Sequence, residues 1–186
     1  MAEPVRVGIL ISGRGSNMMA LVEQAQGYEV ALVASDRPDA AGLAWARERG
    51  IATFALSPKG IGKAGYEAEI DAALRAAGVQ VIALAGYMRL LSDAFVARWR
   101  ERIVNIHPSL LPRYKGLDTH SRAIAAGDAT AGCSVHVVTE ELDGGAVLGQ
   151  AEVSILPGDT ADTLAARVLV AEHALYPRIL AEYVSR

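Results

Sequence analysis

A polar pair at the end of an apolar strand is the part of this sequence best suited to chemistry. Residues 103–107 read Ile-Val-Asn-Ile-His, and Pro108 follows directly. Side chains alternate along a strand, so Asn105 and His107 share one face while their apolar neighbours face the other way. A proline donates no ladder hydrogen bond, so the strand is expected to end where the two polar side chains emerge. An amide can donate to a developing oxyanion and an imidazole can move a proton near neutral pH, which suits acyl transfer through a tetrahedral intermediate.

A third candidate, Asp143, precedes Gly144-Gly145 in the short segment between two strand-like runs. Asp-Gly is a common turn signal, so a purely structural role stays open. An aspartate near His107 would favour the protonated imidazole, and its carboxylate could accept a proton through water. Asp143 is therefore expected either to shape the turn or to support His107.

A glycine-containing turn, Ser12-Gly13-Arg14-Gly15-Ser16-Asn17, separates the first predicted strand from its helix. Glycines let the backbone approach a ligand, and the free N–H groups at a helix start attract anions, so we expect a phosphate site. A dinucleotide-binding fingerprint would place a third glycine where Met18 stands, although Asp36 lies about where its ribose-binding acid is expected. Phosphate binding is thus favoured over nicotinamide dinucleotide binding, and a tight structural turn is the remaining alternative.

Other polar residues are weaker candidates. Glu172 falls at the margin of the apolar stripe of the last helix, where an unpaired carboxylate is costly, so it should meet a donor or a ligand. For His136, a place in the core is at least as well supported as a function. Cys133 lies on the opposite strand face from His136 and is expected only to pack. His120 and His173 are expected at the surface.

Short β-rich runs alternate with helical patterns through most of the chain, which predicts parallel strands covered by helices on both faces. The last third instead predicts an antiparallel hairpin, followed by a helix that begins after Asp159-Thr160. The predicted fold class is α/β, a doubly wound, mainly parallel sheet with an antiparallel hairpin near the C-terminal half, in one domain spanning residues 1–186. The predicted strands are 5–11, 28–35, 52–56, 79–85, 103–107, 133–139 and 146–153, and the predicted helices before the last one are 17–26, 40–49, 63–77, 92–100 and 119–126.

Composition excludes several classes of protein. The 186 residues include 18 Lys and Arg against 21 Asp and Glu, and the net charge of −3 argues against a nucleic-acid partner. The single cysteine rules out an internal disulfide and a cysteine-rich zinc site, and we expect no metal and a cytoplasmic location. Apolar runs stay shorter than the roughly 18 residues of a membrane-spanning segment.

Four motifs occur together and in order: residues 13–17, 86–92, 105–112 and 140–145. Gln150-Ala151, Gly158-Asp159-Thr160 and the run from Glu172 to Pro177 complete the pattern. From about residue 6 to about residue 180 the chain resembles the folate-dependent formyltransferases, and among them the glycinamide ribonucleotide formyltransferases in particular. The asparagine, histidine and aspartate motifs are common to all formyl-handling relatives, whereas the glycine turn with the terminal Glu-His motif narrows the choice.

The resemblance implies a Rossmann-like fold and transfer of the formyl group of 10-formyltetrahydrofolate to the amine of glycinamide ribonucleotide, in purine biosynthesis. The amine would attack directly, with neither a metal nor a covalent enzyme intermediate. By resemblance, Asn105 and His107 would stabilise the oxyanion, and Asp143 would support His107.

The resemblance also implies two binding regions. Gly15, Ser16 and Asn17 would bind the ribonucleotide phosphate, and Glu172 would help to hold its glycinamide-ribose part. The folate pocket would be formed by Met88, Arg89, Leu90, Leu91, Asn105, Thr139, Glu140, Glu141, Leu142 and Asp143. Lys63 stands at the apparent position of a ligand-binding arginine of many relatives, and keeps its charge without the bidentate fork.

Other functions remain open on the sequence. A formyltetrahydrofolate hydrolase would use the same three residues on water. A methionyl-tRNA formyltransferase would share the catalytic residues. Proteins of that kind are longer and carry a C-terminal RNA-binding domain, which this short, acidic chain is not expected to have. A nicotinamide-dependent oxidoreductase or a non-catalytic nucleotide-binding module would use the glycine turn but would leave Asn105, His107 and Asp143 unexplained. The expected partners are small-molecule substrates, with no membrane, and the chain is expected to be a monomer or a homodimer.

Overall fold

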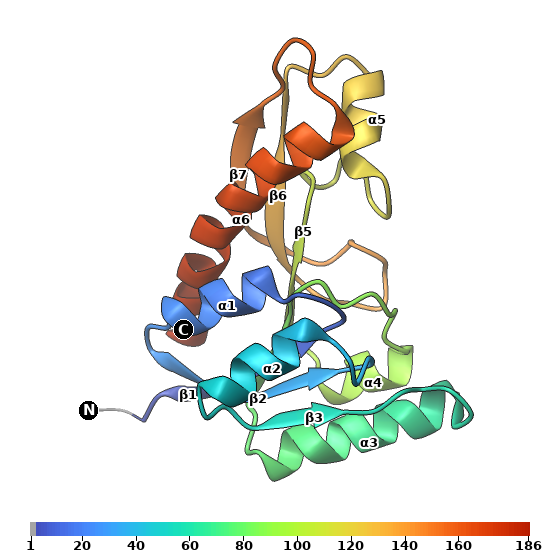
Figure 1. Ribbon diagram of the computed structural model, residues 1–186, viewed down its shortest axis with the longest axis vertical. Coiled ribbons are helices and arrows are strands. Elements are labelled where there is room, and N and C mark those ends of the chain that lie inside the picture. The colour runs from blue at the N-terminus through green and yellow to red at the C-terminus, as the bar shows by residue number, and fades with distance from the viewer. Residues whose placement is uncertain (1–2) are drawn as a thin grey trace.

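The computed structural model describes residues 3–186, and a seven-stranded sheet in the order β3-β2-β1-β4-β5-β6-β7 forms its centre (Figure 1). The strands β1 to β5 pair in parallel, whereas β5–β6 and β6–β7 are antiparallel. This confirms the predicted α/β class, the mainly parallel sheet and the hairpin. The strands are β1 (Val5–Ile11), β2 (Tyr28–Ser35), β3 (Thr53–Ala55), β4 (Val81–Leu84), β5 (Ile103–His107), β6 (Thr130–Val137) and β7 (Val147–Ser154).

The change to antiparallel pairing begins one strand before the predicted hairpin. The chain that joins β5 to β6 carries the helix α5 (Thr119–Ala125), which lies past the end of β5 and beside the upper part of β6 in Figure 1. β6 therefore starts near the end of β5 and returns beside it, pairing His107 with Ser134 and Asn105 with His136. Two polar side chains of β6 consequently lie beside the two of β5.

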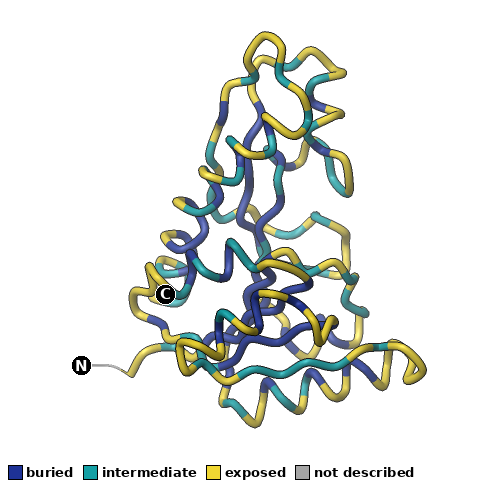
Figure 2. Tube along the Cα trace, viewed as in Figure 1, coloured by how far each residue is buried: buried dark blue, intermediate teal, exposed yellow. Residues whose placement is uncertain are grey.

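The other helices cover both faces of the sheet and enclose two apolar cores. One core contains Met18, Leu43, Tyr176 and Leu180 beneath α1, α2 and α6, and the other contains Tyr66, Leu74 and Trp99 beneath α3 and α4. Buried segments follow the central strands, and the outer helix faces are exposed (Figure 2). These helices are α1 (Ser16–Glu23), α2 (Ala41–Glu48), α3 (Gly62–Ala76), α4 (Asp93–Arg98) and α6 (Ala161–Val184).

The last helix begins where the sequence predicts. Thr160 accepts a hydrogen bond from the amide of Thr163, whose hydroxyl accepts one from the amide of Thr160 in turn. This reciprocal cap satisfies two amide groups that the helix itself leaves free. The predicted stripe points into the core through Leu164, Val168 and Leu175.

The loops that matter for binding gather at one edge. β1 and β4 are neighbours at the centre of the sheet, and the chain leaves them in opposite directions, toward β2–β3 and toward β5–β7. Open α/β sheets bind ligands at such a switch point, beyond the carboxyl ends of the strands. The segments that follow β1, β4 and β5 therefore converge there. In the part of the chain that the structure describes, no helix is long and apolar enough to cross a bilayer.

Candidate active site

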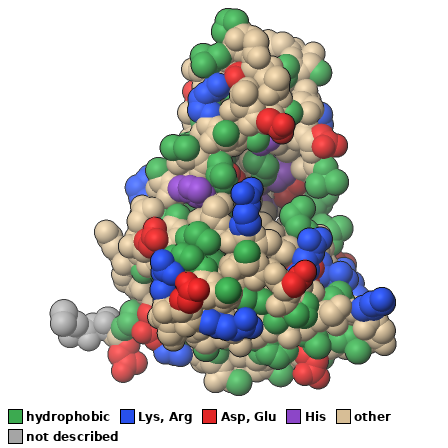
Figure 3. Space-filling model, in the orientation of Figure 1, with side chains coloured by type: hydrophobic (Ala, Val, Ile, Leu, Met, Phe, Trp, Pro, Cys, Tyr) green, Lys and Arg blue, Asp and Glu red, His purple; other side chains and the backbone are tan. Residues whose placement is uncertain are grey.

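A pocket of about 430 Å³ opens at the carboxyl ends of β4 and β5. In the space-filling view, histidine and acidic side chains show in a recess on this side of the molecule (Figure 3). The pocket contains every residue predicted for catalysis and for the folate site: Lys63, Met88, Arg89, Leu90, Leu91, Asn105, His107, Thr139, Glu140, Glu141, Leu142 and Asp143. The structure thus brings four separate stretches of the chain into one cavity.

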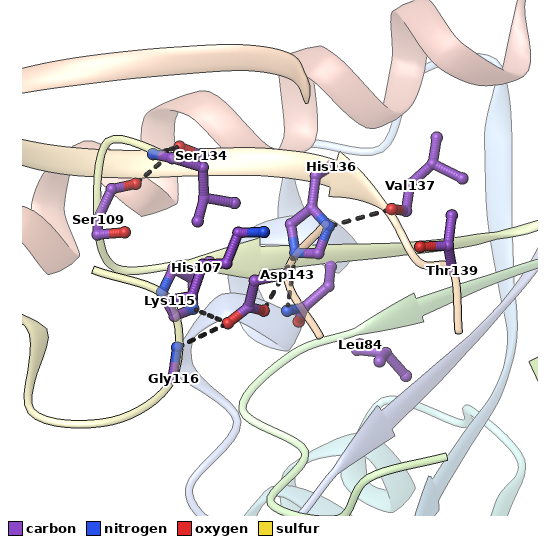
Figure 4. A network of polar contacts seen from close by, with 12 residues as sticks. Leu84, His107, Ser109, Lys115, Gly116, Ser134, His136, Val137, Thr139 and Asp143 are labelled. Atoms are coloured by element: carbon purple, nitrogen blue, oxygen red, sulfur yellow. Dashed lines mark hydrogen bonds and ion pairs between the residues drawn. The ribbon is translucent and has the colours of Figure 1, made fainter. Parts of the chain in front are cut away.

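Asp143 reaches His107 from the segment between β6 and β7. Its backbone is left-handed, with φ 49°, and this turns the carboxylate toward the end of β5. The Oδ2 atom lies 3.6 Å from Nδ1 of His107 and accepts a hydrogen bond of 2.9 Å from the amide of Gly116 (Figure 4). Both side chains are 8% exposed, so bulk water screens this pair little. Of the two roles open for Asp143, support of His107 has the necessary geometry.

The second ring nitrogen of His107 is also engaged. Nε2 lies 2.9 Å from the carbonyl oxygen of Tyr114, which can only accept, so Nε2 carries a proton. The Ser109 hydroxyl donates to the same carbonyl and to that of Arg113, which holds this turn against the end of β5. His107 is therefore held between a backbone carbonyl and a carboxylate. Sequence reasoning did not anticipate the Tyr114 contact because a backbone carbonyl leaves no mark in the pattern of side chains.

His136 belongs to the pocket, a position that the sequence left open. Its side chain is 3% exposed, Nε2 lies 3.3 Å from Nδ2 of Asn105, and Nδ1 lies 3.1 Å from the carbonyl of Val137. Nε2 is also 3.7 Å from Oδ1 of Asp143 (Figure 4). Burial lowers the pKa of His136, which favours the neutral ring. The alternation of Ser134 and His136 was the signal, but it needed the pairing of β6 with β5 to point to the site.

The loop after β4 forms the opposite wall. The amide of Met88 donates to the Ser12 hydroxyl, which donates in turn to Oδ1 of buried Asp36. Asp36 thus orders two loops through Ser12, which gives it a structural role in place of the ribose contact of a dinucleotide site. Met88 and Leu90 expose about two thirds of their surface at the rim, with Leu117 and Leu142 also exposed. Such an apolar rim above a polar floor suits a flat, largely aromatic ligand.

The glycine turn is shaped as predicted but lies outside the pocket residues. Gly15 precedes α1 with φ 74°, and a Cβ there would come within 2.7 Å of the Met18 side chain. The first intrahelical bond runs from Met19 to the carbonyl of Gly15, so the amides of residues 16–18 have no intrahelical partner. The buried Oδ1 of Asn17 has no hydrogen-bond partner among residues 3–186. The free amides lie at the positive end of the helix dipole, where an anion is stabilised, whereas the Asn17 oxygen can only accept a hydrogen bond from a donor.

Glu172 does not find the donor that its sequence position calls for. The side chain is 7% exposed, and no hydrogen bond or ion pair to its carboxylate forms within residues 3–186. Burial raises its pKa to about 7. Burial and the nearby Glu172 also raise the pKa of Cys133 to about 12, so this cysteine stays a thiol and packs as expected. The sequence predicted that Glu172 would meet either a donor within the protein or a ligand. Because no such donor is present among the described residues, a ligand is the partner that still fits the prediction.

The expectation that His120 and His173 lie at the surface is wrong. Both are half-buried, and Nδ1 of His120 and Nε2 of His173 are buried without a partner among the described residues. Burial lowers the pKa of both rings. Tertiary packing explains both cases. His173 is covered because α6 packs against α1, and Gln24, just after α1, donates a hydrogen bond to the His173 carbonyl. His120 is covered because α5 begins close to His107. In the described part of the chain no three His, Cys, Asp or Glu side chains are grouped to hold a metal ion.

Comparison with known proteins agrees with this geometry. Residues 5–180 match the family model described as formyl transferase. The chain is 43% identical to phosphoribosylglycinamide formyltransferase of Escherichia coli over 95% of the chain and 85% of that protein. It is also 47% identical to a trifunctional purine biosynthetic protein of Drosophila melanogaster. That match covers 97% of this chain but only 14% of the length of the Drosophila protein.

The solved structures give the same picture. The phosphoribosylglycinamide formyltransferase of Brucella melitensis superposes with a TM-score of 0.94 at 51% identity, covering 99% of this chain and 97% of that one. A glycinamide ribonucleotide transformylase from Symbiobacterium toebii gives a TM-score of 0.95 at 38% identity, covering 100% and 90%. Agreement at this level over nearly the whole chain shows the family: the chain belongs to the formyl transferases.

Proposed function

We propose that this protein transfers the formyl group of 10-formyltetrahydrofolate to the amine of glycinamide ribonucleotide, a step of purine biosynthesis. The observation that carries the proposal is the convergence of Asn105, His107 and Asp143 at the floor of one pocket. The similarity to phosphoribosylglycinamide formyltransferases supports the choice of substrate. The two substrates would enter from opposite sides, the folate by the Met88–Leu91 wall and the ribonucleotide by the glycine turn.

The pocket residues fit the formyl donor. The exposed side chains of Met88, Leu90 and Leu142 offer an apolar surface for its ring system, while Lys63 offers a positive charge for its carboxylates. The reacting carbonyl would then lie against Asn105, whose amide nitrogen donates to the oxygen as negative charge develops. One such donor accelerates acyl transfer by about 10²- to 10³-fold.

His107 and Asp143 supply the proton movement. The attacking amine loses a proton as it bonds to the formyl carbon, and the departing folate nitrogen gains one when its bond breaks. The Asp143 carboxylate is placed to accept the first proton through a water molecule and to return it by the same route to the departing folate nitrogen, and the neighbouring imidazole stabilises the charges that arise. No residue has to form a covalent bond with the formyl group.

The ribonucleotide side uses the free groups at the start of α1. The amides of residues 16–18 would bind the phosphate, beside Gly15, whose backbone can come close to it because no side chain intervenes. Glu172, buried and unpaired, would accept hydrogen bonds from the glycinamide-ribose part. Binding would remove the cost of leaving this carboxylate without a partner.

The direct test measures both products with and without the acceptor. Purified protein is incubated with 10-formyltetrahydrofolate, and tetrahydrofolate and formate are followed separately. We expect tetrahydrofolate release only when glycinamide ribonucleotide is present, with no matching formate. Equal release of tetrahydrofolate and formate that does not depend on the ribonucleotide would mean a hydrolase and would refute the proposal.

A further inference from the structure

A second histidine touches the catalytic asparagine and is itself tightly held. Asn105 and His136 are directly paired across the antiparallel strands β5 and β6, so their side chains leave the sheet on the same face. Nε2 of His136 lies 3.3 Å from Nδ2 of Asn105. Among the residues that the structure describes, this is the only hydrogen bond of the Asn105 side chain.

The other ring nitrogen decides which role Nε2 plays. Nδ1 of His136 lies 3.1 Å from the carbonyl oxygen of Val137, and a carbonyl can only accept a hydrogen bond. Nδ1 must therefore carry the proton. In a neutral ring this leaves a lone pair on Nε2, which can only accept, and the group facing it must donate.

An acceptor at Nε2 fixes the orientation of the asparagine amide. An amide has one end with two N–H donors and one end with a carbonyl acceptor, and the two ends have almost the same shape. The Nε2 lone pair attracts the N–H end and repels the oxygen end. One N–H of Asn105 then points at His136 while the second remains free for the pocket.

We propose, on the basis of the formyl transfer proposed above, that His136 is a positioning residue that orients the Asn105 amide with its N–H group toward the reacting carbonyl oxygen. Without this neighbour the amide can turn over, and its oxygen would then face the developing oxyanion. A reversed amide repels the charge that Asn105 is there to stabilise. His136 does not touch the reacting atoms and acts through Asn105.

The surroundings of the ring favour the neutral form that this role needs. The groups facing His136 are Asn105 and His107 from β5, the Val137 carbonyl of its own strand, and Asp143 from the segment after β6. Burial lowers the pKa of His136 more than the carbonyl and Asp143 raise it. Oδ1 of Asp143, at 3.7 Å from Nε2, is beyond hydrogen-bond distance, whereas Asn105 is within it.

The first test reads the tautomer of His136 without using activity. Protein labelled with ¹⁵N histidine is studied by long-range ¹H–¹⁵N correlation at neutral pH, and His136→Gln identifies the signals by their loss. We expect a protonated Nδ1 and an unprotonated Nε2. A protonated Nε2, in a neutral or a charged ring, would overturn the inference even if formyl transfer itself is confirmed. If the expected tautomer is found but the protein does not transfer formyl groups, the proposed function has failed and not the structural observation about His136.

The second test asks whether His136 acts through Asn105. His136→Phe keeps a ring but removes the acceptor, and His136→Gln keeps an acceptor near the place of Nε2. We expect kcat to fall by roughly 10- to 100-fold in H136F, within the loss for one oxyanion donor, with KM for both substrates nearly unchanged. H136Q is expected to recover most of that loss.

The decisive comparison places H136F in an N105A background. If His136 works only through Asn105, the second substitution adds no further loss of kcat to N105A. A merely structural role predicts that the two losses multiply, and that H136Q is impaired as much as H136F. Thermal unfolding and circular dichroism of each variant control for folding, and if H136F does not fold, the tautomer and the activity of H136Q decide the matter.

Discussion

Nδ1 of His107 and Oδ2 of Asp143 lie 3.6 Å apart, although one residue ends a central strand and the other belongs to a loop beyond the next strand. The Gly116 amide donates to the same carboxylate oxygen, so the aspartate joins the β5 end, the loop that follows it and the β6–β7 segment. The carboxylate thus closes one side of the pocket and sets the charge around the imidazole. Its removal should affect chemistry more than folding.

Asp143→Asn is expected to lower kcat by about 10²- to 10⁴-fold, the usual range for a group that assists proton transfer. Asparagine tolerates the left-handed backbone at this position and can still accept from Gly116, so the fold should persist. Steady-state kinetics with the formyl donor and the ribonucleotide measure the loss. Asp39→Asn, at an exposed aspartate outside the pocket, is the matched control. A kcat within threefold of the unmodified protein would contradict the role given to Asp143.

Glu172→Gln is expected to change how stability depends on pH. The carboxyl group has a pKa of about 7 in the folded protein against an ordinary 4.5, so folding is not penalised below pH 4.5. As the pH rises from 4.5 to 7, ionisation of the buried group costs stability, up to about 3 kcal/mol. The glutamine variant lacks this cost, so it should gain relative stability through that window and keep a constant advantage above it.

Urea unfolding at a series of pH values between 4 and 8 measures this difference. Glu48→Gln, at an exposed glutamate, should show no such dependence. Parallel stability curves for E172Q and the unmodified protein would show that Glu172 is not the group responsible. If Glu172 also binds substrate, the more stable variant should have a higher KM for the ribonucleotide.

Gly15→Ala is expected to destabilise the protein by about 1–3 kcal/mol, because the position has φ 74° and the new Cβ would come within 2.7 Å of the Met18 side chain. Gly13→Ala is the matched control, since a Cβ at Gly13 meets nothing within 4 Å. Chemical denaturation of both variants gives the comparison. Equal stabilities would mean that the turn can relax, and that its left-handed residue is not a requirement of the fold.

Lys63→Ala is expected to raise KM for the formyl donor by about three- to tenfold and to leave kcat unchanged, because an exposed charge at the rim contributes modest binding energy. Raising the ionic strength should reduce the difference. Lys59→Ala removes a nearby exposed charge that does not line the pocket, and should leave KM unchanged. A salt-independent effect, or one shared by both variants, would show that Lys63 is not a ligand contact.

Local patterns predicted most of the fold. The apolar runs of β1 and β4, the glycines between strand and helix, and the cap at Thr160 correctly indicated the elements and the parallel sheet. The main departures were at boundaries and at β6, which begins at Thr130 and pairs with β5 as well as β7. Ala131 and Gly132, near its start, have weak strand propensity, and partners distant in sequence hold them in the sheet.

The site was predicted in part by the same local rules and in part by resemblance. Strand alternation alone placed Asn105 and His107 on one face, because the geometry of a strand forces it. The distance from Asp143 to His107, the Tyr114 carbonyl behind the ring, and the pairing of His136 with Asn105 all depend on how β6 returns beside β5. The pairing of residues between β5 and β6 cannot be read from any local sequence pattern.

By itself, the sequence determined the backbone periods, the turn chemistry and the types of side chain, since each follows from steric limits on neighbouring residues. Only the tertiary structure decided which polar groups meet and which remain alone, such as the paired His107 and the unpaired Glu172. Hydrogen bonding and desolvation depend on atoms brought close in space by strand pairing and helix packing. The chemistry of this pocket is therefore a property of the long-range contacts, built on elements that the local sequence specifies.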